Sequence, residues 1–272
     1  MKVRMGHVLW IAVGLVLLWA ALRWFERANL YFPSREFTMG PQTFGLSYEE
    51  VFLRTEDGVR IHAWLLPAQR PGPVLLYCHG NAGNISSRMY KANLFHRLGL
   101  GVLLFDYRGY GKSEGRPSEE GTYRDAEAAW RWLVEEKRVR PEDIVVYGES
   151  LGNAIALETA LRHPPRALIL ESAFTSVVDM GELIFPFLPV RAMTTIRYDN
   201  LAKIPRVSCP VLVMHSREDS IVPFEMGRRL FEAAPEPKRF FELKGSHDEG
   251  YIDTGEAYSG EILGFLAGLK GR

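Results

Sequence analysis

Three polar residues in this chain have the types and the order that nucleophilic acyl transfer requires. Ser150 lies in the pattern GESLG, His247 lies in the polar segment KGSHD, and Asp219 lies between them along the chain. A serine hydroxyl becomes an effective nucleophile when an imidazole takes its proton, and a carboxylate orients that imidazole. The sequence therefore predicts Ser150 as the nucleophile, His247 as the general base and Asp219 as the acid that orients it.

The GESLG pattern has the surroundings of a tight turn between a strand and a helix. β-Branched residues precede it, and a stretch rich in alanine and leucine follows it. Gly148 and Gly152 would let the strand and the helix approach without Cβ clashes, and the turn would set Ser150 at a helix N-terminus. Because GxSxG also occurs in simple turns that close a βα unit, the prediction depends on these flanking elements.

Two backbone N–H groups are candidates for binding the negative oxygen of a tetrahedral intermediate. Leu151 follows the nucleophile and is expected to supply the first. The second is expected from Asn81, in the loop HGNAGN that follows the apolar run VLLYC. A glycine-rich loop can instead bind phosphate, but this one lacks the lysine and the serine or threonine of a phosphate-binding loop.

Other residues compete for the roles of base and acid. His79 and His215 also lie at the ends of expected strands, where structural hydrogen bonding is the alternative to catalysis. Glu218 adjoins Asp219 and Glu171 ends a strand, so both stay open as rival acids.

Short apolar runs alternate with stretches of helical period along the body of the chain. Continuous apolar runs predict strands buried on both faces, and the alternation predicts a mostly parallel twisted sheet with helices on both faces. Residues 48–54 and 60–66 flank an Asp-Gly pair and predict a hairpin. The later strands are expected at Val74, Val102, Ile144, Ala167, Val211 and Arg239, and the helices over 86–98, 122–136, 151–163, 224–234 and 256–269.

The first segment predicts a membrane anchor. Residues 8–25 contain one charged side chain, Arg23, and a helix of that length would be roughly 27 Å long, close to the ~30 Å of a bilayer's hydrocarbon core. Lys2 and Arg4 precede the run as in a signal peptide, but no clear cleavage site follows it. We expect an uncleaved single-pass anchor over residues 1–27, with a removed signal peptide or a packed helix as alternatives. The weak charge bias favours a catalytic domain outside the cytoplasm.

A polar connector over residues 28–46 leads into one expected catalytic domain over residues 47–272. An insertion at about 172–208 is rich in phenylalanine, leucine and methionine. Insertions of this length often contain helices of their own and are often functional. We expect a short cap that shelters an acyl chain above Ser150, with a helix packed on the body as the alternative.

The composition limits the partners and the redox chemistry. The formal net charge is zero and the basic residues are scattered, so the sequence offers no basic surface for nucleic acid. Cys78 and Cys209 adjoin apolar runs and are expected to be buried free thiols. Nothing in the sequence indicates an oligomeric state.

Five motifs in order resemble the α/β-hydrolase superfamily, and specifically its membrane-anchored ABHD-type serine hydrolases. They are HGNAGN, FDYRGYGKSEG, GESLGN, CPVLVMHSREDSIVP and GSHDEGY. The resemblance implies hydrolysis of a carboxylic ester or thioester through an acyl-enzyme, without metal or organic cofactor. The chain departs from many relatives at Asn153, where a second glycine commonly follows the elbow, and Asp106 and Arg108 are expected to be structural.

These expectations together favour a lipid-like or acylated substrate, met at a membrane. A catalytically silent binding protein of the same fold is one alternative, because fold alone does not guarantee activity. A serine peptidase of the same fold is the other, although such an enzyme would normally need a large additional domain.

Overall fold

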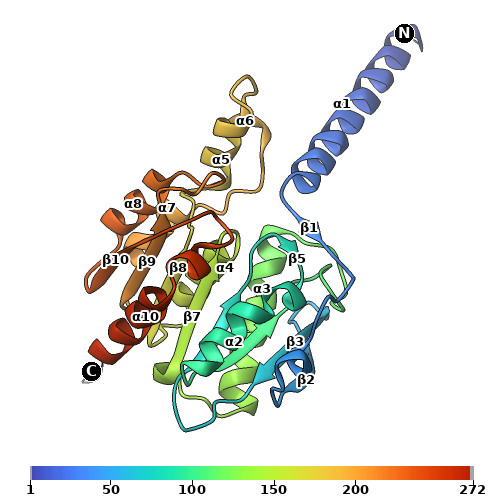
Figure 1. Cartoon of the computed structure of the whole chain (residues 1–272). Helices are drawn as coiled ribbons and strands as arrows, with labels where there is room; N and C mark the ends of the chain where they lie inside the picture. The colour runs from blue at the N-terminus through green and yellow to red at the C-terminus, as the bar shows by residue number, and fades with distance from the viewer. Residues whose placement is uncertain (1, 270–272) are drawn as a thin grey trace.

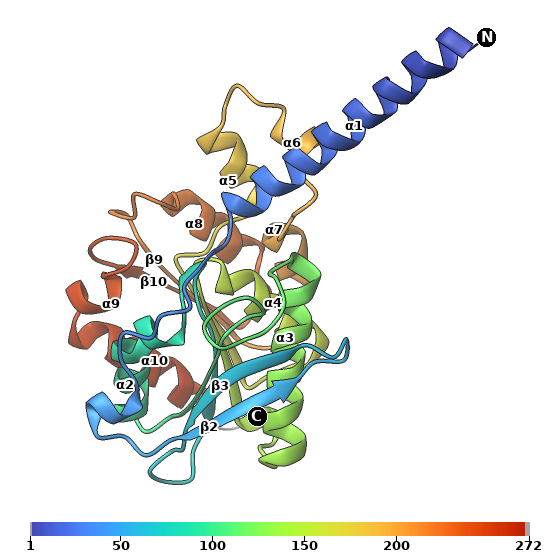
Figure 2. The same cartoon turned by 90° about the vertical axis from the view of Figure 1, so that its right-hand side faces the viewer.

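The computed structural model describes residues 2–269 of the 272-residue chain. Residue 1, at the start of the expected anchor, and residues 270–272, at the end of the expected catalytic domain, lie outside the described residues. The described chain forms an open α/β body from which one long helix projects (Figures 1 and 2).

An eight-stranded sheet in the order β10-β9-β8-β7-β4-β6-β3-β2 forms the centre of the body. β2 and β3 form the predicted antiparallel hairpin, and β3 pairs antiparallel with β6. The other six strands of the sheet, in the spatial order β6, β4, β7, β8, β9 and β10, run parallel to one another. The predicted mostly parallel sheet is therefore confirmed. The strands are β2 (Glu49–Arg54), β3 (Arg60–Leu66), β4 (Val74–Cys78), β6 (Gly101–Phe105), β7 (Ile144–Glu149), β8 (Ala167–Glu171), β9 (Val211–Ser216) and β10 (Lys238–Leu243).

Helices cover both faces of this sheet, as the buried strands require. Alternate side chains of a strand point to opposite faces, so Leu76 and Cys78 of β4 pack with α3, α4 and α8, while Leu75 and Tyr77 pack with α2 and α10. The covering helices are α2 (Met89–Arg97), α3 (Glu119–Arg131), α4 (Gly152–Arg162), α8 (Phe224–Ala233) and α10 (Glu256–Gly268), and a shorter helix, α9 (Gly250–Asp253), precedes the last of them.

The insertion between β8 and β9 contains short helices, which lie above the carboxyl ends of the strands (Figure 1). Ser176 is the N-cap of α5 (Val177–Ile184), and its hydroxyl accepts a hydrogen bond from the N–H of Asp179. α6 (Val190–Met193) and α7 (Asn200–Lys203) follow. We refer to residues 172–208 as the cap.

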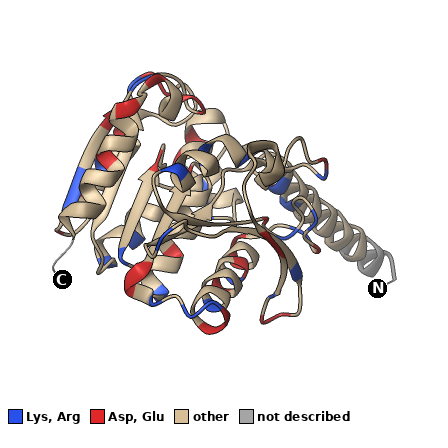
Figure 3. Ribbon diagram, turned by 60° about the horizontal axis from the view of Figure 1, so that its bottom comes forward, with Lys and Arg blue, Asp and Glu red and all other residues tan. Residues whose placement is uncertain are grey.

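The N-terminal helix α1 (Lys2–Ala28) contains a 20-residue stretch, Leu9–Ala28, that is long and apolar enough to cross a membrane. Figure 3 shows basic and acidic residues interspersed over the body, while most of α1 carries neither. After α1, the short strand β1 (Phe32–Pro33) pairs in parallel with β5 (Ala82–Gly83). The sequence did not predict this pair, because two-residue strands have no hydrophobic period.

Candidate active site

Ser150 lies in a tight turn between β7 and α4. Its φ of 50° is left-handed, a backbone conformation that costs a non-glycine residue energy and is common at functional sites. A Cβ at Gly152 would overlap the carbonyl of Cys78, and one at Gly148 would come within 2.6 Å of the backbone of Asn153. Both positions therefore require glycine, for the reason that the sequence pattern suggested.

His247 and Asp219 are held in contact by loops that follow β10 and β9. The Nδ1 of His247 lies 2.7 Å from Oδ2 of Asp219. The other carboxylate oxygen accepts hydrogen bonds from the N–H groups of Ile221, at 2.9 Å, and Val222, at 2.8 Å. A proton on Nδ1 satisfies this contact and leaves Nε2 free to accept a proton.

The pair has the charges that a base and its orienting acid need. Burial lowers the pKa of His247, but the hydrogen bond to Asp219 and the negative charge of Asp219 outweigh burial and raise this pKa above its ordinary value. Burial also favours neutral Asp219, but hydrogen bonds from His215 and His247 outweigh it and hold the pKa of Asp219 well below its ordinary value. Asp219 is therefore ionised at neutral pH.

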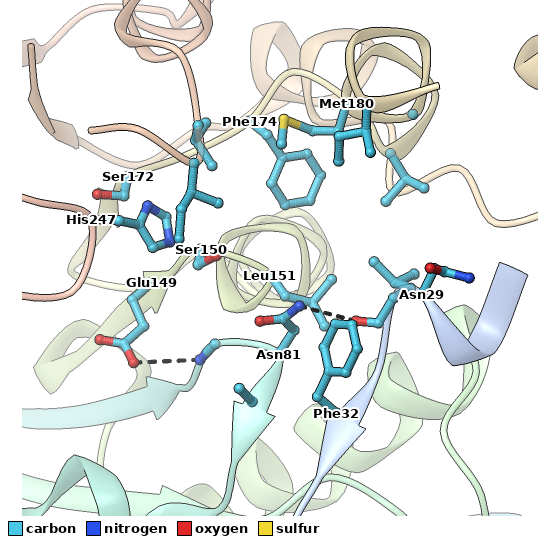
Figure 4. Close-up of a pocket in the computed structure, with 18 of the residues that line it drawn as sticks. Asn29, Phe32, Asn81, Glu149, Ser150, Leu151, Ser172, Phe174, Met180 and His247 are labelled. Atoms are coloured by element: carbon cyan, nitrogen blue, oxygen red, sulfur yellow. Dashed lines mark hydrogen bonds between the residues drawn. The ribbon is translucent and has the colours of Figure 1, made fainter. Parts of the chain in front are cut away.

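Ser150 and His247 lie near each other in one cavity, which both residues line (Figure 4). Among the hydrogen bonds of the described residues, none joins their side chains. In enzymes without bound substrate this bond is often long and tightens when the substrate arrives. The structure thus brings the three predicted residues into one site, with the imidazole engaged by the acid.

The two predicted oxyanion donors flank Ser150. In the described part of the chain, the N–H groups of Leu151 and Asn81 donate no hydrogen bond, so both are free for a ligand. The position of Asn81 is fixed by its other groups. Its side chain donates to the carbonyl of Leu30 at 3.1 Å, and its own carbonyl accepts from the N–H of Phe32 at 3.0 Å and the hydroxyl of Tyr110 at 2.9 Å.

The rival residues have other partners. His79 is buried and stacks on Tyr107, and burial lowers its pKa to about 4, so it stays neutral. His215 is buried beside Asp219, with its Nε2 3.3 Å from the carboxylate. Glu218 is exposed. Glu171 accepts hydrogen bonds from the hydroxyls of Tyr147 and Tyr258 instead of contacting His247.

Asp106 and Arg108 are structural in this arrangement. Asp106 accepts a hydrogen bond from the N–H of Ile85, and Arg108 forms ion pairs with Asp57 and Asp125. Both therefore hold loops in place, as the sequence suggested.

A buried group of charges under the elbow was missed by sequence reasoning. The ammonium group of Lys91 lies 2.6 Å from Glu149 and 2.9 Å from Glu171, and Arg88 pairs with Glu149 at 2.5 Å. Burial lowers the pKa of Lys91, but the two carboxylates outweigh it and raise this pKa. Glu149 is one of the two variable residues of the GxSxG pattern, and its position beside Ser150 was the one available signal.

The cavity that contains the site has a volume of about 670 Å³. Polar groups lie at its base, around Ser150 and His247. Its upper wall is apolar and comes from the cap and from the N-terminal segment, including Phe174, Met180, Phe185, Phe25 and Phe32. This shape fits a ligand with an apolar chain and a reactive polar end.

Metal ligands do not gather in this cavity or elsewhere in the described part of the chain, where no group of three or more His, Cys, Asp or Glu residues could hold a metal ion. Cys78 and Cys209 are buried free thiols, as expected, and burial raises the pKa of Cys209 to about 12.

Known proteins share both the sequence and the fold. A sequence profile described as the alpha/beta hydrolase fold matches residues 73–189. The alpha/beta hydrolase domain-containing protein WAV2 of Arabidopsis thaliana is 32% identical over 94% of this chain and 91% of its own length. The lysophosphatidylserine lipase ABHD12 of Danio rerio is 32% identical over 73% of this chain and 62% of its own length.

Among solved structures, the esterase Pf2001 of Pyrococcus furiosus superposes with a TM-score of 0.73 at 19% identity, over 87% of this chain and 98% of the esterase. This likeness shows the fold. Together with the sequence matches, it establishes that the chain belongs to the α/β-hydrolase family, as an ABHD-type protein.

Proposed function

We propose that this protein is a serine hydrolase that cleaves carboxylic ester or thioester bonds of lipid-like or acylated substrates. The observation that carries the proposal is the contact between His247 and Asp219, at 2.7 Å, in the same cavity as Ser150. The apolar upper wall supports a substrate with an acyl chain, and the relative named as a lysophosphatidylserine lipase supports a lipid ester.

In the proposed mechanism, His247 removes the proton of Ser150 while the hydroxyl oxygen attacks the carbonyl carbon. The N–H groups of Leu151 and Asn81 bind the resulting oxyanion. The protonated imidazole then gives its proton to the leaving alcohol or thiol, and an acyl-enzyme forms. Water, activated by the same imidazole, releases the acid and restores Ser150.

We further propose that residues 1–27 anchor the protein, that residues 28–46 connect the anchor to a catalytic domain over residues 47–272, and that this domain lies outside the cytoplasm. The apolar stretch Leu9–Ala28 supports the anchor. Digestion of the catalytic domain by protease added to intact cells tests the orientation.

The nucleophile is tested with a fluorophosphonate probe. The wild-type protein should be labelled, and Ser150→Ala should lose all labelling, because the probe reacts with an activated serine. Ser172→Ala is the matched control, since Ser172 lines the same cavity and also has a left-handed backbone, with a φ of 52°. Labelling that persists in Ser150→Ala would exclude this nucleophile.

A further inference from the structure

The last turns of α1 are part of the cavity wall. Leu22, Phe25 and Glu26 line the cavity, as do Ile184 and Phe185 of the cap. The aromatic rings of Phe25 and Phe185 lie 5.6 Å apart. The helix expected to hold the protein at a membrane therefore also encloses the space above Ser150.

Hydrogen bonds join this end of α1 to the cap. The carboxylate of Glu26 accepts from the N–H of Thr195 at 2.6 Å and of Ile196 at 2.7 Å, and also from the hydroxyl of Thr194. Arg23 donates to the carbonyl of Met193 and pairs with Glu26 at 2.7 Å. The side chain of Arg23 therefore points toward the cap, where Glu26 and the carbonyl of Met193 accept its hydrogen bonds.

The apolar wall of the cavity continues onto the outer surface of the cap. Ile184 and Leu188 both line the cavity and are exposed. Leu183 is exposed beside them, and Phe187, at the tip of the cap, is 97% exposed. Figures 1 and 2 show the cap and α1 projecting from the same end of the body. Apolar surface that adjoins a candidate membrane span points to lipid as the material that covers it.

The position of Leu22 along α1 indicates how deep in a membrane the part of the cavity between α1 and the cap would lie. Leu22 lies six residues before Ala28, the end of the apolar stretch, which at ~1.5 Å per residue corresponds to about 9 Å along the helix axis. A bilayer has a hydrocarbon core of ~30 Å. With Leu9–Ala28 in a membrane, the part of the cavity between α1 and the cap lies within one leaflet, reaching about 9 Å from the end of the span.

We propose that the acyl chain of the substrate enters the cavity sideways from this leaflet, between α1 and the cap, and that the cap tip around Phe187 is immersed in the lipid. The inference rests on the proposed hydrolase function and specifies its substrate as a single-chain acyl ester or thioester that resides in the bilayer. Leu22, Phe25 and Ile184 then act as determinants of acyl-chain specificity.

The full-length protein in phosphatidylcholine vesicles tests the entrance. Leu22→Trp should narrow the entrance and reduce the hydrolysis of p-nitrophenyl palmitate at least about tenfold more than that of p-nitrophenyl butyrate, because several methylene groups lose their burial. Leu17→Trp, at an exposed position of α1 outside the cavity lining, should leave both rates unchanged. Equal losses in the rate of hydrolysis of the two esters, or no loss for either, would overturn the proposed route of entry.

The immersion of the cap is measured without any substrate, so failure of the proposed function is distinguishable from failure of this inference. Both native cysteines are buried, so a thiol-reactive bimane fluorophore can be attached selectively to an introduced cysteine. The test variant is Phe187→Cys, and the control is Phe52→Cys on the exposed face of β2. Spin-labelled lipid should quench the fluorophore at position 187 several-fold more than the one at position 52. Equal quenching at both positions would overturn the proposal.

Discussion

Backbone strain in this protein gathers at the candidate site. Of the four non-glycine residues with positive φ in the described chain, Ser150 and Ser172 both line the cavity. A left-handed backbone costs a non-glycine residue about 1–2 kcal/mol, so surrounding contacts must hold these turns in place. At Ser150 one of those contacts is the hydrogen bond from its N–H to the carbonyl of Glu171, at 3.0 Å.

The pH dependence of hydrolysis reports the proposed base. The protonated imidazole of His247 cannot take a proton from Ser150, so kcat/KM for a soluble ester should fall as pH decreases through the pKa of His247, which Asp219 raises above its ordinary value of 6.5. Asp219→Asn removes the charge that raises this pKa. The midpoint should therefore move to lower pH, and the rate should fall by up to about 10⁴-fold. A midpoint that stays in place would show that Asp219 does not act on the base.

Lys91 should be essential for stability, because it pairs with two buried carboxylates, of which Glu149 also pairs with Arg88 while Glu171 has no other ion pair among the described residues. Lys91→Met should lower the free energy of unfolding by about 3–5 kcal/mol, the usual cost of leaving buried charges without their partner. Lys137→Met is the control, since Lys137 pairs with Glu49 at the surface, where such pairs contribute at most about 1 kcal/mol. Denaturant unfolding gives both values, and equal small losses would contradict the role of Lys91.

The sequence predicted the proposed catalytic residues better than the residues around them. Ser150, Asp219 and His247 each follow an apolar strand, so their elements could be read locally and the parallel sheet brings strand ends to one edge. Lys91 gave no such signal, because a lysine in an amphipathic helix normally faces solvent. Its partners lie 58 and 80 residues away along the chain, and local patterns do not encode such pairings.

At the scale of elements, α4 is tied to the neighbouring strand by one side chain. Asn153, where the resemblance to the superfamily led us to expect a glycine, donates through Nδ2 to the carbonyls of Ser150 at 2.8 Å and Glu171 at 2.7 Å. The amide thus connects the elbow to the end of β8. The departure was visible in the sequence, but the hydrogen-bond partners of the Asn153 amide could not be predicted, because they depend on tertiary contacts.

Replacing this residue tests the connection. Asn153→Gly should lower the free energy of unfolding by about 2 kcal/mol, because two buried hydrogen bonds are lost and a glycine enters the first turn of α4. Arg162→Gly, at an exposed position in the last turn of the same helix, measures the cost of glycine, about 1 kcal/mol, together with the small loss of its surface ion pair with Glu158. Thermal or urea unfolding measures both. Equal losses would mean that the amide hydrogen bonds add nothing.

At the scale of the whole molecule, the strands were predictable from their apolar runs and the covering helices from their helical period. Residues 28–46 were predicted only as a connector, because they have no period that would show how they pack on the body. In the structure its backbone pairs with the Asn81 loop, and the hydroxyl of Tyr31 lies 2.9 Å from that of Tyr198. These contacts depend on residues distant in sequence.

The anchor makes a simple prediction about the mature protein. Because α1 contributes to the cavity wall, we expect the chain to keep it, so intact-mass measurement of the membrane fraction should find a mass that includes α1. The protein should also stay in the membrane pellet after alkaline carbonate extraction, as expected of a spanning helix. A shortened chain in the soluble fraction would identify the first segment as a signal peptide.

The segment that connects α1 to the body is very short. The helix ends at Ala28, and the carbonyl of Leu30 already accepts the hydrogen bond from Asn81. With α1 in a membrane, as proposed, a protein held this closely would not reach into the surrounding water, and it would search for substrate by lateral diffusion in two dimensions. Its rate would then follow the mole fraction of substrate among the lipids, so that adding inert lipid slows the reaction even when the total amount of substrate in the tube is unchanged.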